Sequence, residues 1–187
     1  MYIYMQPENF KAILRSSYLD QKDAKRKLKS LGYKYDNKLS TNESKVFVDK
    51  KGNPNIVARG SYNAKDWLIS DPLLALGLSR YDPRQKATND LVKKVSARYH
   101  KDPDLYGHSL SGHLIEDAKT TGQKYTLNKG VGLADIGKTI GKNQYDYRTS
   151  NDLVSALSVT QNHLAKKTTY FNPLQNPLSA HTITNLK

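Results

Sequence analysis

The 187-residue chain has no cysteine, one tryptophan, two methionines and three phenylalanines. Without cysteine the protein can form neither disulfide bonds nor thiolate metal sites. No apolar run is long enough to cross a bilayer, and the first residues lack the charged and then apolar layout of a signal peptide. We therefore expect a soluble protein, located in the cytoplasm or in a virion.

Acidic side chains are also scarce, because 17 Asp and Glu residues face 30 Lys and Arg residues and the formal net charge is +13. A positive field of this size favours anionic partners. We expect a lipid or membrane surface, above all an anionic one. A protein assembly is a second class of partner, and nucleic acid ranks below both. The plain alternative is that the charge serves solubility alone.

The motifs of two common chemistries are missing. The sequence contains no His-Glu-x-x-His motif and no cluster of carboxylates, so we expect no catalytic metal. It also lacks the Gly-x-x-x-x-Gly-Lys-Ser/Thr motif, which argues against nucleotide hydrolysis. We therefore expect a chemistry that needs no cofactor.

The length of the chain suits one well-buried domain and is short for two, so we expect a single domain over residues 1–187. Residues 1–43 are predicted to form a basic helical region packed on this domain. Its helices are expected over residues 8–19 and 20–31, and Asp20 is placed to cap the second one.

The second of these helices is predicted to be amphipathic. Ala24, Leu28 and Leu31 share its apolar face. The other face carries basic residues: Lys22, Lys25, Arg26, Lys27 and Lys29. This basic face is either simply solvated or a surface for an anionic lipid or another partner.

The middle of the chain alternates between strand and helix patterns. Residues 45–49 and 55–59 flank a Gly/Asn/Pro turn and predict a β-hairpin. Residues 83–99 predict a helix. Its expected inner face consists of residues four apart, Ala87, Leu91, Val95 and Tyr99. The further elements expected are strands over 104–106, 125–128 and 145–149, a helix over 110–119, a glycine-rich loop over 130–141 and an irregular tail from residue 165.

A serine lies between glycines where an apolar segment meets a helix-like one, in Tyr106-Gly-His-Ser-Leu-Ser-Gly112. A nucleophile elbow requires such small residues, because its backbone turns too sharply for bulky neighbours and lifts the serine hydroxyl clear of the sheet. Asp152 and then His181 follow Ser109 along the chain. The order Ser, Asp, His is that of α/β-hydrolases and not of the chymotrypsin or subtilisin folds.

A serine hydroxyl becomes a strong nucleophile only when a base takes its proton, and a carboxylate must hold that base in one tautomer. We assign Ser109 as the nucleophile, His181 as the base and then the acid, and Asp152 as the carboxylate that orients it.

Four blocks follow one another along the chain: Val57-Ala-Arg-Gly-Ser61 with Lys65-Asp-Trp-Leu68, Gly107-His-Ser-Leu-Ser-Gly112, Tyr147-Arg-Thr-Ser-Asn-Asp-Leu-Val154 and Ala180-His-Thr-Ile183. They resemble the oxyanion segment, the nucleophile elbow, the acid loop and the terminal histidine loop of the class 3 lipases, the fungal triacylglycerol lipase-like α/β-hydrolases. The resemblance implies a compact α/β-hydrolase-type sheet flanked by helices. It also implies an oxyanion hole made by the backbone N–H groups of Ser61 and Leu110, assisted by the Ser61 hydroxyl.

Other residues compete for the roles of base and acid. His163 is the rival base because it also follows Asp152, but the short spacing leaves it little room to return to the serine. Asp135 and Asp146 are the alternative acids; Asp152 is preferred because it directly follows a predicted strand within the block that matches the acid loop. We expect the side chain of His108 to point away from the substrate.

The chain departs from the family pattern at Ser111, where the family has a glycine, so the turn should be slightly more crowded.

An apolar cluster is formed by Leu73, Leu74, Leu76 and Leu78. It fits either the core or, as the resemblance implies, a lid over the acyl site. Trp67 is expected to be a packing anchor.

These features predict a serine esterase or lipase that hydrolyses acyl esters of glycerides or phospholipids through an acyl-enzyme intermediate. The positive charge favours anionic membrane phospholipids over neutral oil droplets. The alternative is a lipase-fold protein, conceivably viral, with weak or lost activity. Its basic surface would then bind a membrane, a nucleic acid or an assembly, and this binding would survive the substitution Ser109→Ala.

Overall fold

A computed structural model of the protein describes residues 7–61, 83–164, 169–171, 180, 181 and 183. The block at 65–68, including Trp67, and the apolar cluster over 73–78 expected to be core or lid lie outside the described residues. The serine elbow, Asp152 and His181 all lie within them.

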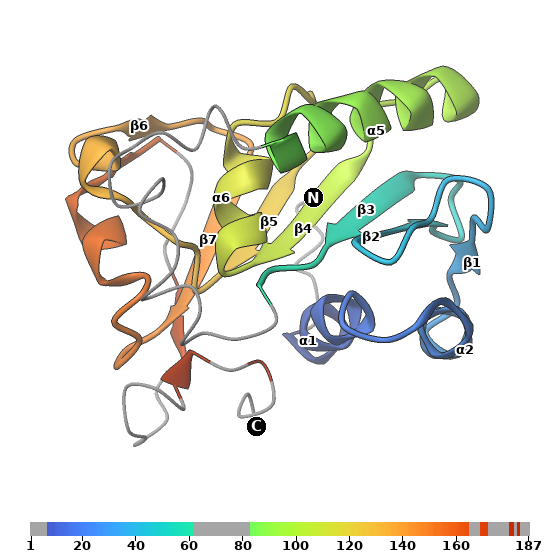
Figure 1. The fold of residues 1–187 in the computed structure, drawn as a ribbon, viewed down its shortest axis with the longest axis horizontal. Helices are drawn as coiled ribbons and strands as arrows, with labels where there is room; N and C mark the ends of the chain where they lie inside the picture. Colours follow the sequence, from blue (N-terminus) through green and yellow to red (C-terminus); the bar gives the residue numbers. More distant parts are fainter. Residues whose placement is uncertain (1–6, 62–82, 165–168, 172–179, 182, 184–187) are drawn as a thin grey trace.

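A seven-stranded mixed sheet forms the centre of the molecule (Figure 1). Its strands follow the order β1-β2-β3-β4-β5-β7-β9. The pairs β1–β2 and β2–β3 are antiparallel, and β4, β5, β7 and β9 continue the sheet in parallel with β3. The strands are β1 Lys34–Tyr35, β2 Ser44–Val48, β3 Pro54–Ala58, β4 Asp104–His108, β5 Lys124–Leu127, β7 Gln144–Thr149 and β9 Thr169–Phe171. A small second sheet pairs β6 (Thr139–Ile140) with β8 (Asn162–His163).

The strands β2 and β3 form the hairpin that the alternating pattern predicts, with Val46 opposite Ile56. Successive residues face opposite sides of the sheet. Phe47 and Val57 belong to one core cluster, whereas Val46 and Ile56 belong to the other. All four side chains are buried, so these strands have apolar residues on both faces.

Helices cover both faces of the sheet (Figure 1). They are α1 Pro7–Ser16, α2 Gln21–Ser30, α5 Pro83–Tyr99 and α6 Leu110–Glu116, with short 3₁₀ helices at Leu133–Asp135 and Ala156–Thr160. The pair α1 and α2 packs on one face through Phe10, Leu14 and Leu28. The pair α5 and α6 packs on the other through Val92 and Ile115. None of the described helices is long and apolar enough to cross a membrane. The described residues thus form a mixed α/β protein with a mostly parallel sheet between helices.

The amphipathic helix predicted after Asp20 is confirmed as α2. The Asp20 carboxylate accepts a hydrogen bond from the Asp23 backbone N–H at 2.8 Å, which caps the first turn. Ala24 and Leu28 are fully buried. The basic residues of the opposite face are all exposed: Lys22, Lys25, Arg26, Lys27 and Lys29.

Two short strands lie in segments that the sequence predicted to be helical or irregular. Residues 1–43 are not helical throughout, because Lys34–Tyr35 pairs with β2. The tail after residue 165 is not entirely irregular, because β9 pairs with β7. In both places an edge strand of the sheet offers unpaired backbone groups, and a short extended segment of almost any composition can satisfy them.

The helix α5 has the predicted bounds, and its predicted inner face is confirmed in part. Val95 is buried, and Leu91 and Tyr99 are half-buried against the core, whereas Ala87 is exposed. The buried residues of the helix are Gln85, Thr88, Val92 and Val95. Their spacing alternates between three and four residues, which follows the 3.6-residue turn, whereas a strict repeat of four drifts around the helix.

We expect the substitution Leu28→Ala to lower the free energy of unfolding by about 2–5 kcal/mol, because it removes a fully buried side chain that joins α2 to the sheet. Urea unfolding followed by circular dichroism measures this change. The matched control is Leu19→Ala, whose side chain is 37% exposed and should contribute less than about 1 kcal/mol. Equal losses for the two variants would contradict the packing of α2 described above.

Candidate active site

The backbone turns sharply at Ser109, between the end of β4 at His108 and the start of α6 at Leu110. Ser109 has φ 59° and ψ −127°, in a region that side-chain-bearing residues rarely adopt. A Cβ atom at Gly107 would lie 2.6 Å from the Ser111 carbonyl oxygen, so only glycine fits there. This strand–turn–helix geometry is that of a nucleophile elbow.

The structure brings Ser109, Asp152 and His181 together. The His181 Nε2 lies 2.8 Å from the Ser109 Oγ, and the His181 Nδ1 lies 2.7 Å from the Asp152 Oδ1. Each of the three residues is at most 3% exposed. Ser109 follows β4 and Asp152 follows β7, so both lie beyond the carboxyl ends of parallel strands, where α/β sheets place their sites.

The Asp152 carboxylate is held from two sides. Its Oδ2 accepts hydrogen bonds from the Ser155 backbone N–H at 2.9 Å and from the Ser155 hydroxyl. Burial alone would raise the pKa of Asp152, but its interactions with His181 and Ser155 outweigh burial and keep the pKa below its usual value. The carboxylate is therefore ionised near neutral pH and holds the Nδ1–H of His181.

The rival residues lie elsewhere. His163 belongs to β8, and its Nδ1 lies 3.6 Å from the Asp146 carboxylate. Asp146 also accepts from Lys129 and Thr126. Asp135 accepts the Gly132 backbone N–H at 3.0 Å. In the described part of the chain, the geometry of a triad is therefore formed by the three residues assigned from the sequence, and their catalytic role stays a prediction.

The predicted oxyanion segment runs beside the nucleophile. A Cβ atom at Gly60 would lie 2.5 Å from the His108 carbonyl oxygen and 3.3 Å from the Ser109 Cβ, so the two backbones are in contact. Ser61 follows directly and is half-buried. Leu110 is the first residue of α6, and a helix leaves its first N–H groups without an intrahelical partner. The structure thus places both predicted donor residues next to Ser109, and their role stays a prediction.

The serine that replaces the family's glycine, Ser111, does not crowd the elbow. Its hydroxyl accepts the His108 backbone N–H at 2.9 Å and lies 2.8 Å from the Ala58 carbonyl oxygen, to which it can donate. The side chain is fully buried. Ser111 therefore ties the end of β3 to the end of β4.

Sequence reasoning missed Asn128, which holds the backbone of Ala180, next to His181. Its Nδ2 donates to the Ala180 carbonyl oxygen at 3.0 Å, and its Oδ1 accepts the Thr149 backbone N–H at 2.7 Å. Asn128 directly follows β5 and has φ 46°. An asparagine just after a predicted strand is a weak signal for such a turn, because asparagine tolerates positive φ better than most residues.

A buried ion cluster lies behind the elbow. Lys129 is 1% exposed, and its ammonium lies 2.5 Å from the carboxylates of both Glu116 and Asp146. Lys138 lies 2.6 Å from Glu116. A Cβ atom at Gly112 would lie 3.1 Å from the Cα of Lys129, so the cluster packs directly against α6.

One part of this cluster resembles a metal site. The potential ligand atoms of His113, Glu116 and Asp135 lie within 4.8 Å of one another. However, the ammonium groups of Lys129 and Lys138 already neutralise Glu116. A divalent cation would have to displace or oppose these charges, so the geometry favours ion pairing over metal binding.

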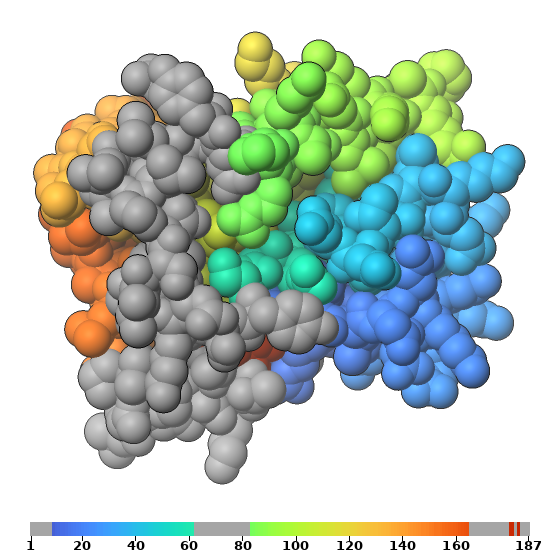
Figure 2. Space-filling view, viewed as in Figure 1, coloured from blue at the N-terminus to red at the C-terminus, as the bar shows by residue number. Residues whose placement is uncertain are grey.

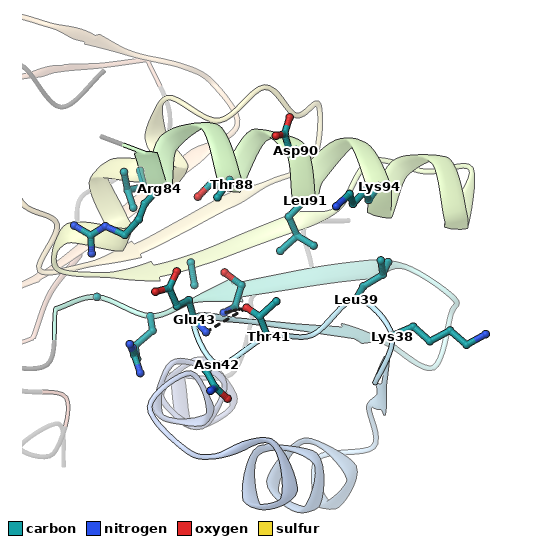
Figure 3. A pocket seen from close by; sticks show the side chains of 16 residues that line it. Lys38, Leu39, Thr41, Asn42, Glu43, Arg84, Thr88, Asp90, Leu91 and Lys94 are labelled. Carbon is teal, nitrogen blue, oxygen red and sulfur yellow. Dashed lines mark hydrogen bonds between the residues drawn. The ribbon is translucent and has the colours of Figure 1, made fainter. Parts of the chain in front are cut away.

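A groove of about 640 Å³ lies between α5 and the loop before β2. In the space-filling view, the green residues of α5 and the blue residues of this loop share one face of the molecule (Figure 2). In the close-up, Arg84 and Leu91 extend from α5 toward Thr41 and Glu43 of the loop, whereas Asp90 points away (Figure 3).

The groove is basic and reaches the candidate site. The charged residues that line it are Lys38, Arg59, Arg84 and Lys94, against Glu43 and Asp90. Gly60, whose backbone contacts Ser109, forms part of the same lining, as does Leu114 of α6. An anionic molecule in this groove would therefore contact the segment beside Ser109, although Ser109 itself does not line the groove.

No protein-family model matches the sequence, and no curated protein matches it. The resemblance to the class 3 lipases therefore rests on the motifs of the chain and stays a prediction.

The ion cluster generates a pH-dependent stability. Burial alone would raise the pKa of Glu116, but Lys129 and Lys138 outweigh burial and lower the pKa from 4.5 to about 2. Because the folded-state pKa lies below the unfolded one, this stabilisation is complete above about pH 4.5 and is lost as the pH falls toward 2.

We expect Glu116→Gln to lower the free energy of unfolding at pH 7 by about 3 kcal/mol, because the ammonium groups of Lys129 and Lys138 each lose one of their carboxylate partners. The difference from the wild type should shrink between pH 4.5 and 2. Urea unfolding at a series of pH values measures it, with the exposed Glu43→Gln as the control. A difference that stays constant with pH would show that the charge of Glu116 does not stabilise the fold.

Proposed function

We propose that the protein is a serine esterase of the lipase type with an α/β-hydrolase fold, similar in its motifs to the class 3 lipases. The observation that carries the proposal is the hydrogen-bonded row from Asp152 through His181 to Ser109. Burying three polar side chains around a serine with positive φ costs stability, and such strained, polar clusters concentrate at functional sites.

In the first half-reaction, the His181 Nε2 takes the proton of the Ser109 hydroxyl while the serine oxygen attacks the ester carbonyl carbon. The carbonyl oxygen becomes negative and would be stabilised by the N–H groups of Ser61 and Leu110. His181 then gives its proton to the alcohol oxygen as the carbon–oxygen bond breaks. The acyl group remains on Ser109.

In the second half-reaction, water attacks the acyl carbon and His181 takes its proton. Collapse of the tetrahedral intermediate releases the fatty acid and returns the proton to the Ser109 oxygen. Asp152 stays ionised throughout and stabilises the positive imidazolium in both steps. The balanced reaction consumes one water and yields an acid and an alcohol, without a cofactor.

The substrate class we favour is a lipid ester in an anionic membrane, a phospholipid rather than a neutral glyceride. The basic groove that reaches Gly60 and the formal net charge of +13 support this choice. Positive charge raises the local concentration of the enzyme at an anionic surface.

The exposed basic face of α2 favours a second candidate function. Its lysines and arginine lie on the opposite side of the sheet from α5 and α6 and could bind a membrane or an acidic assembly without catalysis (Figure 1). In that case the protein would be a lipase-fold binding component with weak or no activity. Nucleic acid is a less favoured partner of the same face.

Treatment with a fluorophosphonate tests the proposal directly. We expect one covalent adduct per chain on the wild type and none on Ser109→Ala, because only an activated serine attacks the phosphorus. Intact-mass spectrometry with and without detergent micelles measures the adduct. Ser30→Ala, the same change at an exposed position of α2, is the control and should still be labelled. Absence of an adduct under both conditions would refute the esterase proposal and leave the binding component.

The dependence of the hydrolysis rate on salt concentration tests the preference for an anionic substrate. We expect hydrolysis of anionic phospholipid vesicles to exceed that of neutral vesicles, and to fall about tenfold or more between 50 mM and 500 mM salt as screening weakens surface attraction. The double substitution Arg84→Gln and Lys94→Gln removes two positive charges from the groove and should lower the rate on anionic vesicles. The control is Lys86→Gln with Lys93→Gln, which removes the same charge from exposed positions of α5 outside the groove and should lower the rate less. Salt-independent turnover of neutral glycerides would exclude the anionic preference.

A further inference from the structure

Two polar side chains beside the triad, Tyr18 and His108, take no part in the reaction described above. His108 is 5% exposed and directly precedes Ser109. Its Nδ1 lies 2.8 Å from the Tyr18 hydroxyl, and its Nε2 lies 2.8 Å from the backbone carbonyl oxygen of His181. A Cβ atom at Gly60 would lie 2.7 Å from the Tyr18 hydroxyl oxygen, so this hydroxyl also packs against the Gly60 backbone. These contacts join three separate segments of the candidate site.

The direction of each hydrogen bond follows from the chemistry of its partners. A carbonyl oxygen can only accept, so the Nε2 of His108 must carry hydrogen and donate to His181. In a neutral imidazole the Nδ1 is then an acceptor, so the Tyr18 hydroxyl donates to it. With a neutral imidazole, this is the one direction that satisfies both hydrogen bonds of His108.

We propose that Tyr18 and His108 are positioning residues, which hold the oxyanion segment at Gly60 and the backbone of His181 in register with Ser109. The proposal rests on the esterase function above. Tyr18 follows α1, so the N-terminal helices contribute to the site although they lie on the face of the sheet away from the elbow helix. The N-terminal helices therefore both cover the core and help to position the candidate site.

The two hydrogen bonds of His108 keep the directions given above only while its imidazole is neutral. Burial and the neighbouring His181 lower the pKa of His108 to about 3. The groups that face it are Tyr18, His181 and, at longer range, Asp152, which opposes the shift. Burial likewise raises the pKa of Tyr18 to about 12, so its hydroxyl keeps the proton that it donates. Neither residue changes its charge near neutral pH.

The test compares variants that keep or remove the donor and acceptor pattern. Tyr18→Phe removes the hydroxyl, with Tyr33→Phe as a matched control, because the Tyr33 ring packs in the same core cluster. His108→Gln retains a donor and an acceptor on one side chain, whereas His108→Leu retains neither. The readouts are kcat and KM on a soluble short-chain ester, and nitrogen NMR of the His108 ring, which reports its tautomer independently of activity. Circular dichroism verifies that each variant is folded.

We expect Tyr18→Phe and His108→Leu to lower kcat about tenfold to 100-fold with little change in KM, because small displacements of the reacting groups are costly. His108→Gln and Tyr33→Phe should retain kcat within about threefold of the wild type. NMR should show hydrogen on the Nε2 of His108 in the wild type. Equal losses for His108→Gln and His108→Leu, an unchanged kcat in Tyr18→Phe, or hydrogen on the Nδ1 would each overturn the proposal. A wild type that neither hydrolyses esters nor reacts with a fluorophosphonate would instead refute the esterase function. The tautomer of His108 alone would then decide whether Tyr18, His108 and His181 are hydrogen-bonded as described.

Discussion

The backbones around Ser109 approach one another so closely that a Cβ atom at Gly60 or at Gly107 would lie within 2.6 Å of a carbonyl oxygen. The candidate site depends on these two close approaches. The first brings the predicted oxyanion segment after β3 against the end of β4. The second packs β4 against the first turn of α6, which the chain enters directly through the positive φ of Ser109. The strain is sustained by the packing of the strands and helices around it.

Buried polar groups hold this crowded region together. Ser111 joins β3 to β4, and Asn128 joins the end of β5 to Ala180, the residue before His181. Tyr18 and His108 join the end of α1 to the backbone of His181. In a buried environment an unpaired polar group is costly, so a change at one of these positions affects its partners as well. The stability of the fold and the geometry of the site are therefore coupled, and the ion cluster around Lys129 extends that coupling behind α6.

Sequence patterns predicted the long elements well, because their signals are local. The hairpin over β2 and β3 and the bounds of α5 follow from alternation, turn residues and helix-start chemistry. The predicted inner face of α5 was right at Val95 and wrong at Ala87, because the buried stripe of this helix also includes the polar residues Gln85 and Thr88. The strands β1 and β9 were missed because the pairing of a short segment depends on which sheet edge lies beside it.

The sequence by itself determined the order of a serine, an acid and a histidine, the need for glycine at the elbow, the positive charge and the absence of thiol chemistry. These depend on composition, on chain order and on the steric demands of one turn. Only the tertiary structure decided that His181 and not His163 lies 2.8 Å from Ser109, 72 residues away in the chain, and that Tyr18 and Asn128 support them. The physical reason is that such contacts depend on strand order, on register and on the path of each loop, which no local pattern of residues encodes.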